Sequence, residues 1–152
     1  MAAFAVDRQT EGSGNEIAAY LFDHSEYMYN PREDTTEHSC TRSPVPGNRL
    51  ADKPVYVLTS ARTFSGAEHF SYDLKMLRGA TLVGETTGGA TDAGTFHRID
   101  DHFGIGIREA RAINPYPEPD WAVAGVKPDV KVRAVDALAT AGKLAEDKLG
   151  RQ

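Results

Sequence analysis

The sequence contains a single cysteine, Cys40, so the chain cannot form an intramolecular disulfide and its fold does not depend on an oxidising compartment. It also lacks any apolar run close to the roughly 20 residues that a membrane-spanning helix needs. Basic residues are the minority, 17 against 22 acidic ones, for a net charge of -5. We therefore expect no membrane partner and no nucleic-acid partner, since the latter would require a basic stripe.

The N-terminal residues, MAAFAVDRQTEG, include no basic segment followed by a long apolar one. We therefore expect no signal peptide there, and the localisation stays open. What is present is the composition of a globular protein: of 152 residues, 40% are hydrophobic and 26% are charged. A chain of this length can bury a core, so we interpret residues 1–152 as one domain.

The first third of the sequence predicts a short strand at residues 4–6 and a helix over residues 13–22, which opens with the capping-box pattern SGNE. Residues 23–52 contain several prolines and a polar stretch, and only residues 27–29 have the composition of a strand. This connection is long for a compact domain, which favours an irregular, flexible arm or flap.

The middle of the sequence predicts a βαβ unit. VYVL at residues 55–58 is typical of a buried strand, and residues 81–83 of a second one. Between them, a capping-box pattern begins at Ser65, and apolar residues follow at helical spacing. A strand–helix–strand unit of this length implies parallel pairing of the two strands.

The last third predicts a glycine-rich loop at residues 84–94, a hairpin with strands at 96–99 and 103–107, and an extended, proline-rich loop at 113–128. A strand at 130–132 and a C-terminal helix at 135–149 follow. The apolar face of this helix is expected to contain Val135, Leu138, Ala141, Leu144 and Ala145.

The segment PVYVLTSARTFSGAEHFSYDLKMLRGATLVGETTGG, residues 54–89, closely resembles the tail-specific (carboxy-terminal processing) serine peptidases. DHFG at 101–104, RAINP at 111–115 and GVKPDV at 125–130 are similar to the bacterial branch related to interphotoreceptor retinoid-binding protein. The resemblance implies an α/β fold, a crotonase- and Clp-protease-like spiral of βαβ units that is truncated here. It also implies that no cofactor is needed, and relatives are often exported.

This resemblance makes Ser65 the catalytic nucleophile and assigns the oxyanion-binding N–H groups to Gly66 and to the region of Gly12. A helix N-terminus suits this role, because its N–H groups and dipole favour a negative charge. The same serine, with Glu68 three residues later, also matches an ordinary helix cap, a role worth about 1 kcal/mol. The sequence leaves both roles open.

The resemblance also shows that the usual bases are missing. One branch of the family uses a lysine 25 residues after the serine, where this sequence has Ala90. The other uses a histidine from an earlier segment, not found here, and a glutamate after the tryptophan of a late motif, where Ala122 follows Trp121. Lys75 is expected to point away from the helix start. A base from a second subunit or from an unrelated histidine would be needed.

Histidines and acids offer a second chemistry. His97, Asp101 and His102 cluster on the predicted hairpin, and His69 follows Glu68. Imidazole and carboxylate ligands suit Zn²⁺ or Mn²⁺, and such a metal would generate hydroxide for ester or phosphoester hydrolysis.

Three functions therefore stay open: a hydrolase of ester or peptide bonds with Ser65 as nucleophile, a metal-dependent hydrolase, and a non-catalytic protein that binds a ligand or peptide. The expected partners are a small ester or peptide substrate and a second copy of the chain. A truncated sheet leaves an open edge and apolar surface, which predicts a homo-oligomer.

Overall fold

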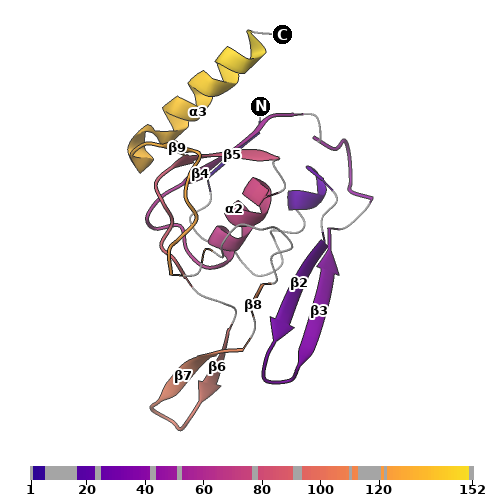
Figure 1. Cartoon of the computed structure of the whole chain (residues 1–152), viewed down its shortest axis with the longest axis vertical. Coiled ribbons are helices and arrows are strands. Elements are labelled where there is room, and N and C mark those ends of the chain that lie inside the picture. The colour runs from indigo at the N-terminus through magenta and orange to yellow at the C-terminus, as the bar shows by residue number, and fades with distance from the viewer. Residues whose placement is uncertain are drawn as a thin grey trace.

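A parallel β-sheet forms the centre of the protein (Figure 1). The computed structural model describes residues 2–5, 17–22, 25–41, 44–50, 53–76, 79–90, 94–109, 111–112, 121 and 123–150. The sheet has the strand order β1-β4-β5-β9, with β1 at Ala2–Ala5, β4 at Val55–Thr59, β5 at Ala80–Gly84 and β9 at Val130–Lys131. The three pairings are parallel. The predicted α/β class is thereby confirmed.

Helix α2 (Gly66–Met76) connects β4 to β5, as predicted for a βαβ unit. Side chains of β4 alternate between the two faces of the sheet. Val55 and Val57 pack in one apolar cluster with Phe70 and Leu74 of α2. Tyr56 packs in a second cluster against the C-terminal helix. The sheet is therefore covered by a helix on each face, and the start of α2 lies at the carboxyl end of β4.

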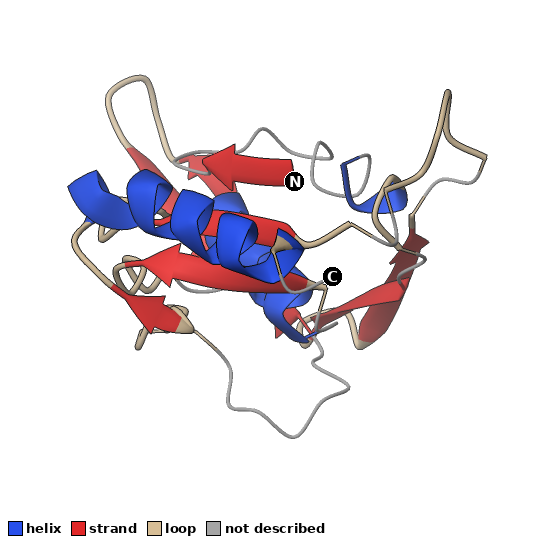
Figure 2. Cartoon of the chain, turned by 90° about the horizontal axis from the view of Figure 1, so that it is seen from above, coloured by secondary structure: helices blue, strands red, loops and turns tan. Residues whose placement is uncertain are grey.

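Helix α3 (Ala134–Leu149) covers the second face of the sheet (Figure 2). It packs through a stripe of small side chains at four-residue spacing, Ala137, Ala141 and Ala145. The predicted face was wrong for Val135 and Leu138, which are 81% and 63% exposed. Their apolar character placed Val135 and Leu138 on the predicted buried face. The helix lies close to the sheet, however, and small alanine side chains fill the contact instead. No helix within the described ranges is long and apolar enough to cross a membrane.

Two antiparallel hairpins extend from this core (Figure 1). The first consists of β2 (Ser25–Asn30) and β3 (Thr35–Cys40), and β2 also pairs with β8 (Arg111–Ala112). The expected strand at residues 27–29 lies within β2, but the interpretation of the rest of residues 25–40 as irregular was wrong. The strand TTEHSC lacks apolar alternation because its described side chains are exposed, so the sequence carries little of the usual strand signal.

The second hairpin, β6 (Gly94–Arg98) and β7 (Gly104–Arg108), agrees with the predicted hairpin to within about two residues. The Asp100 carboxylate accepts the backbone N–H groups of His102 and Phe103 at 2.7 and 2.8 Å, which closes the turn. Residues 94–106 are exposed throughout. This hairpin contributes nothing to the two apolar clusters of the core.

Gly84, the last residue of β5, lies very close to the backbone of β4. Its φ is +140°, and a Cβ there would lie 2.0 Å from the Thr59 carbonyl oxygen. Gly84→Ala is expected to lower the free energy of unfolding by about 2–3 kcal/mol, through strain and displacement of β4. Urea denaturation measures the change. Gly106→Ala is the matched control, since nothing lies within 4 Å of a Cβ there. Equal midpoints for the two variants would contradict the prediction.

Candidate active site

Ser65 lies between the end of β4 and the start of α2, after a tight turn. In this turn the Thr63 hydroxyl accepts the Ser60 N–H at 3.0 Å, and the Thr63 N–H donates to the Ser60 carbonyl at 3.0 Å. The turn leads to Ser65 with φ at +57°. This left-handed conformation costs a non-glycine residue about 1–3 kcal/mol, and such strain is concentrated at functional sites.

The Ser65 hydroxyl does not act as the predicted helix cap. An N-cap serine uses its side-chain oxygen to accept the N–H of the second or third helical residue. Here the Glu68 N–H donates to the Ser65 backbone carbonyl at 2.8 Å. Within the part of the chain that the structure describes, Ser65 Oγ makes no hydrogen bond. The exposed side chain therefore presents its hydroxyl at the positive end of α2.

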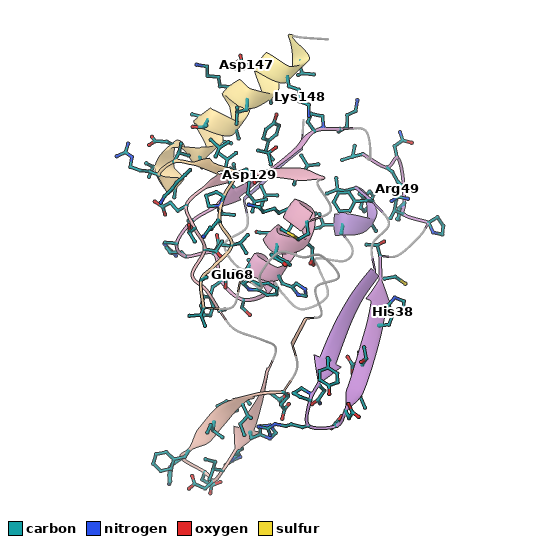
Figure 3. The ribbon with its side chains drawn as sticks, viewed as in Figure 1. His38, Arg49, Glu68, Asp129, Asp147 and Lys148 are labelled. Atoms are coloured by element: carbon teal, nitrogen blue, oxygen red, sulfur yellow. The ribbon has the colours of Figure 1, made fainter. Side chains whose placement is uncertain are left out.

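Glu68 is fully buried in the first turn of α2, where it is labelled in Figure 3. Its Oε1 accepts the Thr87 hydroxyl at 2.5 Å and the Gly89 N–H at 2.6 Å. Its Oε2 accepts the N–H groups of Ser65 at 3.0 Å and Ala90 at 2.7 Å. Four hydrogen bonds satisfy the acceptor capacity of a carboxylate. Glu68 thus ties the residue before α2 to the glycine-rich loop.

This network brings position 90 next to Ser65, because the N–H groups of both residues bind the same carboxylate oxygen. Ala90 is buried, and its methyl group carries no base. Lys75 is directed elsewhere, since its Nζ donates to the Lys127 carbonyl at 2.7 Å and lies 3.0 Å from Asp129 Oδ1. Neither residue supplies a proton acceptor for Ser65.

The turn that follows Trp121 packs against the same loop. The Thr87 N–H donates to the Val126 carbonyl at 3.2 Å, and the Val126 N–H donates to the Thr87 hydroxyl at 2.7 Å. Gly89 has a φ of +80°, and a Cβ there would lie 2.5 Å from the Val123 carbonyl oxygen. This contact requires glycine at position 89. The late motif, which begins at Trp121, and the glycine-rich loop are therefore held together beside Ser65.

His69 lies one helical turn after Ser65 and contacts this late motif. Its ring stacks on the Trp121 indole, with centroids 5.2 Å apart and an interplanar angle of 18°. Its Nε2 lies 3.5 Å from Asp73 Oδ2. The indole Nε1 of Trp121 is buried and has no hydrogen-bond partner among the described residues. The aromatic contact thus brings together two segments that are separated by 52 residues.

The predicted metal ligands are not brought together: His69 lies in α2, whereas His97, Asp101 and His102 belong to the β6–β7 hairpin or its turn. His97 Nε2 lies 2.7 Å from Glu109 Oε1, and Asp101 forms an ion pair with Arg98. Among the described residues, no three His, Cys, Asp or Glu side chains form a group that could hold a metal ion. The metal-dependent alternative has no support in this part of the chain.

Glu109 instead binds the side chain of His97 on the same hairpin. Hydrogen bonds from the side chains of Thr95 and His97 lower the pKa of Glu109 below its usual value, because they stabilise the ionised form. His97 is therefore engaged in a local contact on an exposed hairpin.

Of the remaining predicted site residues, Gly66 is the first residue of α2, directly after Ser65. Gly12 and Ala122 lie outside the described residues. Sequence reasoning did not identify Thr87, Asp73 or the structural role of the Trp121 ring. The SGAE pattern gave a signal for Glu68, but only as a capping partner of Ser65.

Comparison with known proteins agrees with this arrangement. The model of peptidase family S41 matches residues 11–132, most of the chain, including Ser65, the glycine-rich loop and the late motif. The chain belongs to peptidase family S41. The predicted tail-specific peptidase relationship is therefore confirmed, and with it a serine-peptidase-related hydrolase fold.

Solved structures of other proteins show a similar fold. The photosystem II D1 C-terminal processing protease superposes with a TM-score of 0.67 at 21% identity, over 88% of this chain and 35% of its own. A Bacteroides fragilis protein that is described as an S41 protease superposes with a TM-score of 0.70 at 19% identity, over 91% of this chain and 39% of its own. A Parabacteroides merdae protein that is described as a peptidase superposes with a TM-score of 0.70 at 18% identity, over 94% of this chain and 51% of its own. The chain thus spans about a third to a half of the length of these three proteins.

Proposed function

We propose that this S41 chain hydrolyses ester or peptide bonds with Ser65 as the nucleophile. The observation that carries the proposal is the geometry of Ser65: its backbone is held in a strained left-handed conformation at the start of α2, and its exposed hydroxyl is not used as a helix cap. A serine that only capped the helix would need neither feature.

In the proposed reaction Ser65 Oγ attacks the acyl carbon of a small ester or peptide. The Gly66 N–H and an N–H near Gly12 would donate to the oxyanion that forms. The positive end of the α2 dipole favours the same charge. Glu68 contributes by position, because its hydrogen bond to the Ser65 N–H fixes the backbone of the nucleophile. We also propose that the fold is a spiral of βαβ units similar to that of crotonase and the Clp protease.

Covalent labelling tests this assignment. A fluorophosphonate probe, which reacts with activated serines, is expected to modify Ser65 in the folded protein, and mass spectrometry of the tryptic peptide identifies the labelled residue. Ser65→Ala should lose the label. Ser60→Ala is the matched control in the same turn and should keep it. A folded protein that takes no label, or takes it on another serine, would rule out Ser65 as the nucleophile.

A further inference from the structure

Phe64, the residue directly before Ser65, is an exposed aromatic side chain beside the proposed nucleophile. Phe64 is 53% exposed, whereas Phe70 on the helix that follows is 6% exposed and packs in the core. Most of the Phe64 ring therefore lies outside the core. A single exposed apolar side chain is common on a protein surface, so the meaning of this one depends on what surrounds it.

The glycine-rich loop fixes the place of the Phe64 ring. The Gly88 N–H donates to the Thr63 carbonyl at 2.9 Å, and a Cβ at position 88 would lie 2.9 Å from Phe64 Cδ2. The ring therefore packs on the backbone of Gly88. Two residues further along this loop, the Ala90 N–H shares its acceptor oxygen with the Ser65 N–H. The ring and the nucleophile thus border the same few residues of the loop.

A second exposed apolar residue meets the loop at its next position. Val123 is 81% exposed, and its carbonyl oxygen lies 2.5 Å from where a Cβ of Gly89 would be. The Val123 φ of +70° is an outlier for a β-branched residue, and strain of this kind is concentrated at sites that hold ligands. Because Gly88 and Gly89 have no side chains, the loop does not cover its own backbone next to either apolar residue.

We propose that Phe64 is a specificity-determining residue and that it forms, with Val123 and the backbone of residues 88–89, a subsite for an apolar acyl group. The inference rests on the proposed function: Ser65 Oγ would bond to the acyl carbon, so the acyl group would start one residue from Phe64. The substrate class is accordingly an ester of a short fatty acid, or a peptide with an apolar residue on the acyl side of the cleaved bond.

The ratio of kcat/KM for p-nitrophenyl butyrate to kcat/KM for p-nitrophenyl acetate tests the inference on the full chain. Each value is divided by the rate of hydroxide hydrolysis of the same ester. The two esters share a leaving group, so the ratio reports the contact with the acyl group and not the strength of the nucleophile. Since burial of one methylene favours binding about fourfold, we expect a ratio of about 5–10 in the wild-type chain, where the subsite is half open. In Phe64→Ser the ratio should fall close to one.

Two further variants make the test specific. Phe96→Ser removes an aromatic side chain that is 71% exposed on the β6–β7 hairpin, which extends from the core in Figure 1, and should leave the ratio unchanged. Gly88→Ala keeps Phe64 but adds a methyl group 2.9 Å from its ring, so the ring must shift and the ratio should fall. A merely structural role of Phe64 would change both rates by the same factor and keep the ratio.

The outcomes separate the inference from the proposed function. If Ser65→Ala abolishes hydrolysis of both esters while folded Phe64→Ser keeps the wild-type ratio, the subsite is refuted and the nucleophile assignment stands. A ratio near one in the wild-type chain also refutes the subsite. If Ser65→Ala hydrolyses both esters at the wild-type rate, the proposed function fails and the subsite fails with it. If Phe64→Ser does not fold by circular dichroism, Gly88→Ala decides, and an unchanged ratio in that variant overturns the inference.

Discussion

Glu68→Ala is expected to lower the free energy of unfolding by about 3–5 kcal/mol, because it removes the acceptor of four hydrogen bonds in a buried site. The N–H groups of Ser65, Gly89 and Ala90 and the hydroxyl of Thr87 would lose their partner together. Each such group costs about 1–3 kcal/mol when it is left unsatisfied, and water entering the vacated space recovers part of that. Urea denaturation followed by far-UV circular dichroism measures the loss.

Two further variants make this prediction specific. Glu68→Gln keeps the shape and one acceptor oxygen, so it should lose about half as much stability as Glu68→Ala. Glu146→Ala removes an exposed carboxylate from α3 and should change the stability by less than about 0.5 kcal/mol. A denaturation midpoint for Glu68→Ala equal to that of Glu146→Ala would mean that the buried carboxylate does not hold the loop to α2.

Ala90→Lys is expected to raise the hydrolysis of an activated ester by about 10²-fold or more, the contribution typical of a general base. The N–H groups of residues 65 and 90 bind the same oxygen of Glu68, so a side chain at position 90 starts close to the nucleophile. Burial disfavours the charged ammonium and lowers the pKa of a lysine there, which makes its amine a better proton acceptor at neutral pH. Steady-state kinetics with p-nitrophenyl acetate measures the gain.

The control for Ala90→Lys is Ala90→Met, which adds a side chain of similar length without an amine. It should show no gain in rate. The double variant Ser65→Ala with Ala90→Lys should also show none, because the new base acts through the serine. A gain that survives the loss of Ser65, or a gain of equal size with methionine, would contradict the predicted Ser–Lys pair.

The sequence predicted the parts of the fold whose burial follows a simple period. Val55, Val57 and Leu82 are fully or nearly buried residues of short apolar runs, and both central strands were located from them. The helix after Ser65 followed from its apolar spacing. β3 was missed because its described side chains are exposed, so its pairing with β2 leaves no hydrophobic pattern.

The candidate site was predictable in its residue types but not in its geometry. Ser65 and Glu68 stood out as a capping pattern, and the resemblance assigned the nucleophile. The left-handed φ of Ser65 and the convergence of Thr87, Gly89 and Ala90 on one carboxylate depend on tertiary contacts over about 20 residues. No local signal encodes them, since hydrogen bonds from backbone N–H groups are nearly independent of the side chain.

The Ala90 hydrogen bond to Glu68 has an evolutionary consequence. Residue 90 holds the glycine-rich loop in place with its main-chain N–H, which every amino acid except proline possesses. Mutation at this codon can therefore add or remove an amine beside the nucleophile while the loop keeps its anchor.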